Sequence, residues 1–171
     1  MIPIINKILY ATDLSKNSAY AFRYAVNSAE KHNAGITILH VLDNLAGTAQ
    51  TLVSSHLNEV QQDKIFEDNI NYTSDWIRER LEVFCKKEFR EEHELLNIID
   101  SIEVRGGFPA EEILQTAEDL HCDAIVMGTH GKGSLSHTFL GSVAQKVLRR
   151  VRKPVFIIPL PKDEEEFKVD I

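Results

Sequence analysis

Short runs of apolar and β-branched residues recur along the chain, and between them apolar residues fall at helical spacing. Such runs are typical of buried strands, whereas apolar residues three and four positions apart are typical of amphipathic helices. Each segment between two runs is long enough to hold a helix, so the pattern predicts parallel strands in an α/β three-layer sandwich. The expected strands are residues 7–11, 36–41, 95–107, 124–127 and 154–159.

The first helix is expected to begin at the hydroxyls of Ser15 or Ser18 and to end near Asn33 or Gly35, which suit a left-handed cap. A long amphipathic helix is expected after residue 62, because Ile70, Ile77, Leu81 and Phe84 share one face. Two later helices are expected from Pro109 and from Ser142. Tyr72 and Trp76 are expected to pack on the sheet or on a partner.

Residues 1–160 are expected to form one domain, with a loop or partly helical insertion at 43–69, and residues 161–171 an acidic, solvated tail. A net charge of −7 argues against general nucleic-acid binding. The two cysteines are far apart and outside any CxxC pair, which argues against a disulfide scaffold or structural zinc. No targeting segment or long apolar run is evident, so we expect a cytoplasmic protein without a membrane partner.

A glycine loop follows the fourth expected strand and precedes the last expected helix. Four of the eight glycines lie in it, at Gly128, Gly131, Gly133 and Gly141. Glycine lets backbone N–H groups approach an anion closely, and the first turn of a helix adds unpaired donors and a positive dipole end. The loop therefore predicts a phosphate-binding site. In parallel sheets, ligands bind outside the carboxyl ends of strands, where Thr12, Asp13 and Val41 are also expected.

Other phosphate-binding loops do not fit the sequence. Gly131-Lys132 is followed by Gly133 instead of Ser or Thr, so the Walker motif is incomplete, and the first strand lacks a dinucleotide GxGxxG. Simpler interpretations stay open: the glycines as turns, Asp13 as a helix cap, and Lys132 as a solvated side chain. We interpret His40, His130 and His137 as ordinary histidines, without a third metal ligand nearby, and Cys122 as a packing residue.

The spacing Gly128-x2-Gly131-x9-Gly141-Ser142 resembles the ATP-binding members of the universal stress protein family. The resemblance extends to residues 7–15 (KILYATDLS) and 151–159 (VRKPVFIIP), and is weakest over 43–69. It implies a Rossmann-like fold of the adenine nucleotide alpha hydrolase type, with five parallel strands in the order 3-2-1-4-5. It also implies a homodimer formed through the last strand, Val155–Ile158.

The resemblance further implies a binding site for ATP or another adenine nucleotide, such as AMP or cyclic AMP. Thr12, Asp13 and Val41 would surround adenine and ribose, and Met127 would pack on the nucleoside. Asp13 would also lie near a nucleotide-bound Mg²⁺ or Mn²⁺ ion. The triphosphate would be lined by Gly128, Gly131, Gly141, Ser142 and Val143.

Three functions stay open on these grounds. The first is a nucleotide-dependent stress-response or signalling module without catalytic residues, because no nucleophile, general base and arginine finger can be assembled around the loop. The second is a slow Mg²⁺-dependent ATPase or autophosphorylating phosphotransferase that uses Asp13. The third is a non-catalytic structural dimer.

Overall fold

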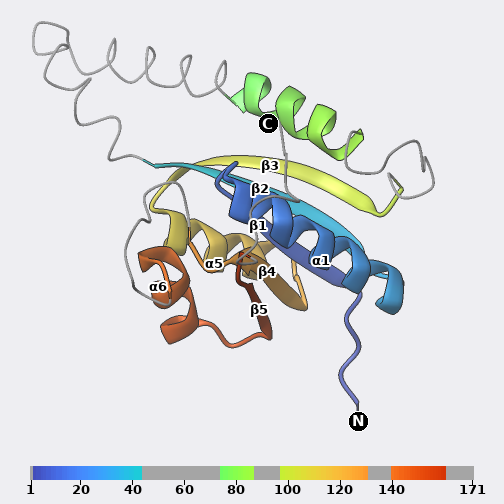
Figure 1. Ribbon diagram of the computed structural model, residues 1–171. Helices are drawn as coiled ribbons and strands as arrows, with labels where there is room; N and C mark the ends of the chain where they lie inside the picture. The colour runs from blue at the N-terminus through green and yellow to red at the C-terminus, as the bar shows by residue number, and fades with distance from the viewer. Residues whose placement is uncertain (1, 44–73, 87–96, 131–139, 161–171) are drawn as a thin grey trace, which may run out of the picture.

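Five parallel strands form one sheet in the order β3-β2-β1-β4-β5 in the computed structural model (Figure 1). The structure describes residues 2–43, 74–86, 97–130 and 140–160. The expected parallel sheet and its strand order are confirmed. The strands are β1 (Lys7–Thr12), β2 (Gly35–Asp43), β3 (Ile99–Gly107), β4 (Ala124–Gly128) and β5 (Val155–Ile158).

Helices cover both faces of this sheet, as the alternating pattern predicts. Helix α1 (Lys16–His32) and the helical segment 74–86 lie on one face (Figure 1). Helices α5 (Pro109–Asp119) and α6 (Ser142–Arg150) pack together on the other face. No described helix is long and apolar enough to cross a membrane.

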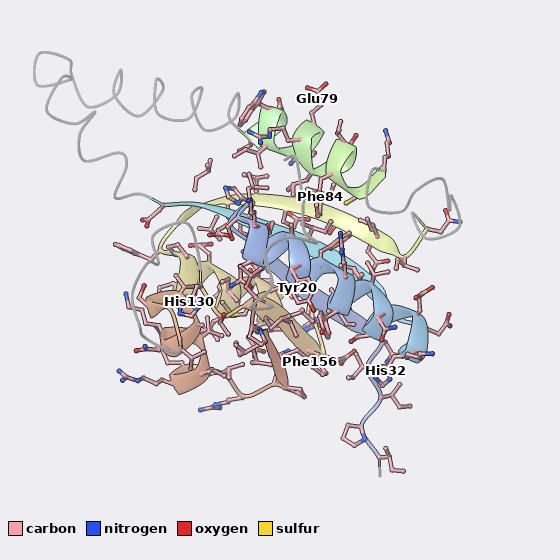
Figure 2. All side chains as sticks on the ribbon, in the orientation of Figure 1. Tyr20, His32, Glu79, Phe84, His130 and Phe156 are labelled. Atoms are coloured by element: carbon pink, nitrogen blue, oxygen red, sulfur yellow. The ribbon has the colours of Figure 1, made fainter. Side chains whose placement is uncertain are left out.

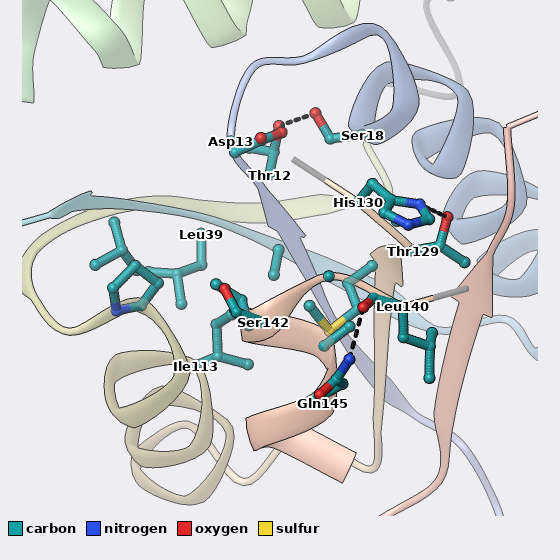
Figure 3. A pocket seen from close by; sticks show the side chains of 18 of the residues that line it. Thr12, Asp13, Ser18, Leu39, Ile113, Thr129, His130, Leu140, Ser142 and Gln145 are labelled. Carbon is teal, nitrogen blue, oxygen red and sulfur yellow. Dashed lines mark hydrogen bonds between the residues drawn. The ribbon is translucent and has the colours of Figure 1, made fainter. Parts of the chain in front are cut away.

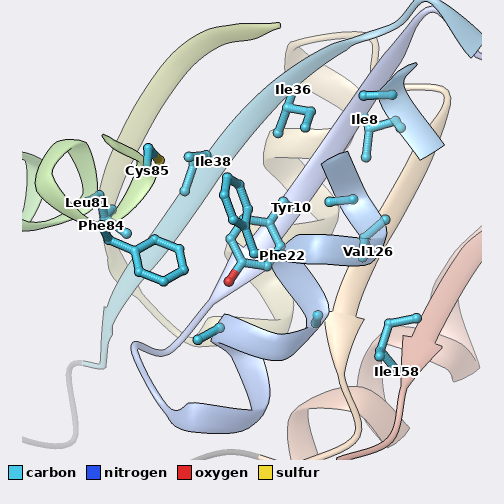
Figure 4. Close-up of a cluster of buried hydrophobic side chains, with 14 of the residues drawn as sticks. Ile8, Tyr10, Phe22, Ile36, Ile38, Leu81, Phe84, Cys85, Val126 and Ile158 are labelled. Atoms are coloured by element: carbon cyan, nitrogen blue, oxygen red, sulfur yellow. The ribbon is translucent and has the colours of Figure 1, made fainter. Parts of the chain in front are cut away.

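The central strands are buried on both faces, which is why their sequences are apolar almost throughout. In β1, Leu9 packs with the α5–α6 face, while Tyr10 packs with α1 and segment 74–86. Aromatic rings fill the second face: Phe22 of α1 lies between Tyr10 and Phe84, with centroid distances of 5.1 and 5.2 Å (Figure 4). Stacked and tilted rings at this spacing add to the burial of apolar surface.

Segment 74–86 confirms the described part of the long amphipathic helix. Ile77, Leu81 and Phe84 are buried, and Phe84 points to the sheet while Glu79 points away (Figure 2). Trp76 is 49% exposed, and the Arg80 guanidinium lies 4.6 Å from its ring centroid, so its expected packing on the sheet or on a partner stays a prediction. Ile70, Tyr72, residues 44–69 of the expected insertion and the tail lie outside the described residues.

The ends of α1 follow the expected capping chemistry. Ser15 is the N-cap, and its Oγ accepts a hydrogen bond from the Ser18 backbone N–H at 3.2 Å. Asn33 is left-handed at φ 53° and closes the helix on two carbonyls. Asp13 is not the cap; its Oδ1 accepts from the Ser15 N–H, at 3.0 Å, one residue before the helix starts. The interpretation of Asp13 as a helix cap is therefore wrong.

Strand register aligns the carboxyl ends of β1, β2 and β4. Thr12 is opposite His40 of β2, and Ala11 is opposite Met127 of β4. Three strands run one or two residues further than the apolar pattern predicts, because ladder pairing continues after the side chains become polar; β2, for example, pairs with β3 out to Asp43 and Gly107. These extensions bring polar residues to one edge of the sheet.

Candidate functional site

A pocket of about 660 Å³ lies at this edge, between the strand ends and the first turns of α5 and α6 (Figure 3). Its volume falls within the range of about 300–1,000 Å³ typical of small-molecule sites. Eight of the nine residues expected at a nucleotide site line it, and Gly131 lies outside the described residues. The eight are Thr12, Asp13, Val41, Met127, Gly128, Gly141, Ser142 and Val143.

Part of the pocket wall is apolar, and sequence reasoning missed some of its residues. Leu39 of β2 and Ile113 of α5 lie in this part of the wall (Figure 3), together with Pro109, the first residue of α5. Pro109 is two residues beyond the end of β3, so its place near a strand's carboxyl end could have indicated the same edge. Asp43, at the end of β2, also lines the pocket. An apolar wall with a few carboxylates suits a flat heterocycle that carries hydroxyl groups.

The turn after β1 is tight and held by side chains. Leu14 has a φ of 62°, a conformation that non-glycine residues adopt at a cost. The Thr12 Oγ1 accepts from the Leu14 N–H at 3.1 Å and donates to the Ser18 Oγ at 3.0 Å. His40 is buried and its Nδ1 lies 2.8 Å from the Thr12 carbonyl oxygen. These bonds hold the turn after β1 in place and thereby fix the position of Asp13 at the pocket.

Another part of the pocket wall is the N-terminus of α6. Gly141 is the N-cap, no side chain caps the helix, and its first turn contains no acidic residue. The first turn of α5, in contrast, contains Glu111 and Glu112. Because the first amides of a helix have no partner within it, the α6 end presents donors and a positive dipole to the pocket. This end is suited to an anion.

The packing around Gly128 and Gly141 gives a reason for glycine at these positions besides the approach of an anion. A Cβ on Gly128 would lie 2.9 Å from the Nδ2 of Asn17, and one on Gly141 would lie 3.1 Å from the carbonyl oxygen of Thr129. Sequence reasoning assigned these glycines to the approach of an anion. At Gly128, therefore, the Asn17 amide already takes the space of a side chain, and at Gly141 a side chain would fit only tightly against the Thr129 backbone.

Asn17 and Thr129 are further residues at this end that sequence reasoning missed. The Asn17 Nδ2 donates to the His130 carbonyl oxygen at 2.9 Å and to the Thr129 Oγ1 at 3.3 Å. The His130 Nδ1 lies 3.0 Å from the same hydroxyl (Figure 3). Asn17 is 112 residues from Thr129 in the sequence, so no local pattern could have paired them.

The described part of the pocket offers few groups for metal or acid–base chemistry. No cluster of three or more His, Cys, Asp or Glu side chains suited to a metal occurs among the described residues. The pocket wall formed by these residues contains neither lysine nor arginine. His137 and Lys132 lie outside the described residues. A cation near Asp13 would therefore have to share its coordination with oxygens of a ligand.

Comparison with known proteins gives a consistent result. The family model described as the universal stress protein family matches residues 5–159. The universal stress protein MJ0577 of Methanocaldococcus jannaschii is 30% identical over 159 residues, which cover 92% of this chain and 97% of that protein. The universal stress protein YxiE of Bacillus subtilis is 31% identical, with 91% and 99% covered.

Solved structures show the same fold. The structure of MJ0577 superposes with a TM-score of 0.70 at 28% identity, covering 93% of this chain and 99% of that chain. A crystal structure of a universal stress protein in complex with cAMP superposes with a TM-score of 0.57 at 19% identity, covering 93% and 100%.

Proposed function

The chain belongs to the universal stress protein family, and on this basis we propose that its pocket binds an adenine nucleotide, with ATP and Mg²⁺ as the full ligand. The observation that carries the proposal is that one 660 Å³ pocket combines an α6 N-terminus without a side-chain cap or acidic residue and a wall with many apolar residues. A nucleotide has the same division into an anionic and a flat, largely apolar part. The cAMP complex of a related fold supports adenine as the base.

Each part of the pocket wall then has a defined role in binding the nucleotide. Val41 and Met127 hold the base and nucleoside, and Asp13 accepts from ribose hydroxyls or lies near the Mg²⁺ ion. Backbone amides at the start of α6 and the Ser142 hydroxyl bind the phosphates. Backbone amides and a bound cation would balance the phosphate charge, to which the described wall adds no lysine or arginine. Gly131 is assigned to the same phosphate site on the resemblance alone.

We infer that the protein holds its nucleotide and acts as a nucleotide-dependent module in stress response or signalling. Rapid phosphoryl transfer relies on a positioned nucleophile or base and on cationic side chains at the transferred group. The described pocket wall offers Asp13, Asp43 and His130 for such roles, but no cationic lysine or arginine. Binding is the function that this set of groups supports best.

Calorimetric titration of the purified chain with ATP and Mg²⁺ tests the proposal. We expect saturable binding at one site per chain, and competition by AMP and cyclic AMP, which share the adenine end. Mass analysis of the chain as purified should also detect a bound adenine nucleotide. Absence of binding at high micromolar ATP, together with no retained nucleotide, would leave only the interpretation as a structural dimer.

Slow hydrolysis of ATP is the second candidate function, because Asp13 lines the pocket and its carboxylate would be available to a nucleotide-bound Mg²⁺ ion. Turnover of labelled ATP by the wild-type chain and by Asp13→Ala distinguishes it. An ATPase would show Mg²⁺-dependent release of phosphate that the substitution abolishes. Release no faster than in buffer would eliminate this candidate while leaving the binding proposal intact.

We also propose that two copies pair through β5. This strand is at one edge of the sheet, and Phe156 in it is 37% exposed. An edge strand presents unpaired backbone groups to a second chain. Pairing of two β5 strands about a two-fold axis would satisfy those groups and cover Phe156.

A further inference from the structure

We propose that Asn17, which is outside the pocket wall, is a positioning residue for the phosphate end of the site. It joins the first turn of α1 to the segment that leaves β4, and through that segment it sets the distance between β4 and the N-terminus of α6. The inference rests on the proposed nucleotide site and adds a residue to it that touches no ligand.

The hydrogen bonds of Asn17 define its orientation. Its Nδ2 donates to the His130 carbonyl oxygen and to the Thr129 Oγ1, at 2.9 and 3.3 Å. Rotating the amide by 180° would place the Oδ1 against the His130 carbonyl oxygen, where two acceptors would repel each other. The side chain is only 7% exposed, so water does not compete effectively for these bonds.

Thr129 carries the effect of Asn17 to α6. Its backbone N–H donates to the Ile158 carbonyl oxygen of β5 at 3.0 Å, and its own carbonyl oxygen accepts from the Gly141 N–H at 2.7 Å. Gly141 is the N-cap of α6, so one residue connects Asn17, the edge strand and the helix end proposed to bind phosphate. A shift of residue 129 would displace the amides of that helix end.

Close packing makes the connection stiff. The Asn17 amide lies against Gly128, where a Cβ would be 2.9 Å from Nδ2. The Thr129 carbonyl oxygen lies against Gly141, where a Cβ would be 3.1 Å from that oxygen. Residues 128 and 129 are therefore packed closely between the Asn17 side chain of α1 and the N-cap of α6. Phosphate donors act best when they are fixed before the ligand arrives, because the ligand then spends no binding free energy on ordering them.

A purely structural role does not explain why this residue is an amide. The Asn17 Oδ1 is buried and accepts no hydrogen bond in the described part of the chain, which is an unfavourable way to fill space. A leucine of similar volume would pack the same site without that penalty. The two donated bonds, which only the amide supplies, fix the backbone and hydroxyl that face the site.

The test compares the affinities of the full chain for ATP and for adenosine in Asn17→Leu and Asn17→Asp. Both variants keep side-chain size and lose both donated bonds. We expect ATP with Mg²⁺ to bind about tenfold more weakly, since a bond of this kind contributes about one factor of ten or less. Adenosine, which does not reach α6, should bind within about twofold of wild type.

Lys153→Met is the matched control, because Lys153 holds the end of α5 through the Ala117 and Cys122 carbonyl oxygens, away from the pocket. It should lower stability while leaving the ratio of ATP to adenosine affinity unchanged. An unchanged ratio in both Asn17 variants, or equal weakening of both ligands, would overturn the inference. If Asn17→Leu does not fold, Asn17→Asp decides. Failure of the wild type itself to bind ATP would instead overturn the proposed function.

Discussion

At the scale of single residues, Gly128 and Asn17 form a matched pair. Gly128 has no side chain, and the Asn17 amide occupies the space where its Cβ would be. Glycine at a strand end next to a phosphate site is usually attributed to the ligand. Here the protein's own packing already requires it, so the two explanations can be separated by mutation.

Gly128→Ala should lower the free energy of unfolding by about 1–3 kcal/mol, the usual effect of an added carbon in a packed site. In the Asn17→Ala background the same change should cost much less, because the amide that it strikes is gone. Urea unfolding of the four proteins in this double-mutant cycle measures the difference. Effects that add to within about 0.5 kcal/mol would show that Asn17 does not impose the glycine.

Tyr10 shows how burial couples stability to pH. Its hydroxyl donates to the Ser18 carbonyl oxygen at 2.6 Å, and burial raises the pKa of this phenol well above its usual value. The folded chain therefore keeps this proton at a pH where the unfolded chain releases it. The stabilisation is complete below the pKa of free tyrosine, about 10, and is lost as the pH rises above it.

Between about pH 9 and 11 the wild-type chain should lose stability more steeply than Tyr10→Phe, since only wild type has this proton to release on unfolding. Denaturant midpoints measured across that range give the two slopes. Tyr20 and Cys122, whose pKa values are also raised, are present in both proteins and so cancel in the comparison. Parallel slopes would contradict the assignment to Tyr10.

At the scale of elements, the local patterns predict the fold well, because a parallel sheet with two covered faces needs apolar runs and amphipathic helices. Ser15 and Asn33 cap α1 as their side chains and backbone preferences indicate. The strand ends are less well predicted, because pairing with a neighbour continues beyond the apolar run. The contacts of Asn17 could not be predicted, since its partner Thr129 is 112 residues away in the sequence.

The basic cluster after α6 illustrates the same limit. Cations stabilise a helix C-terminus, so composition alone assigns Arg149, Arg150, Arg152 and Lys153 to the end of α6. Arg149 and Arg150 do occupy the last turn of α6, and Arg150 pairs with Glu111 of α5. Lys153 instead serves α5: its Nζ lies 2.8 Å from the Cys122 carbonyl oxygen and 3.3 Å from that of Ala117. Composition predicts the charge, but only tertiary structure decides which helix end it stabilises.

Lys153→Met should therefore destabilise the chain by about 1–2 kcal/mol, the range for hydrogen bonds from a charged donor at a partly buried helix end. Arg152→Met is the control, because Arg152 is exposed, and it should change stability by less than about 0.5 kcal/mol. Thermal or urea unfolding measures both. Equal effects of the two substitutions would show that Lys153 contributes only surface charge.

At the scale of the whole molecule, the proposed nucleotide site and the proposed dimer strand lie at different borders of the sheet. The pocket lies at the polar carboxyl ends of the strands. Strand β5, which contains Phe156, is the last strand of the sheet, next to β4 (Figure 2). Thr129 of the pocket wall donates to Ile158 of β5, so the proposed nucleotide site and the proposed dimer strand are in direct contact. Dimer formation and nucleotide binding are thus expected to influence each other.

Phe156→Asp should convert a wild-type dimer to a monomer, because it places a charge in the proposed β5 interface. Val83→Asp is the control, as Val83 is 57% exposed on segment 74–86, far from β5 in the fold. Sedimentation velocity over a range of concentrations measures both. A monomeric wild type, or a Phe156→Asp protein that stays dimeric, would contradict pairing through β5.

The most direct measurement of the central claim is a crystal structure of the chain grown with Mg²⁺ and a non-hydrolysable ATP analogue. We predict phosphates at the backbone amides of Ser142 and Val143, next to Gly141, whose own N–H is donated to Thr129, with the base between Val41 and Met127. Nucleotide bound elsewhere on the molecule, or an empty pocket at a saturating concentration of the analogue, would contradict the claim.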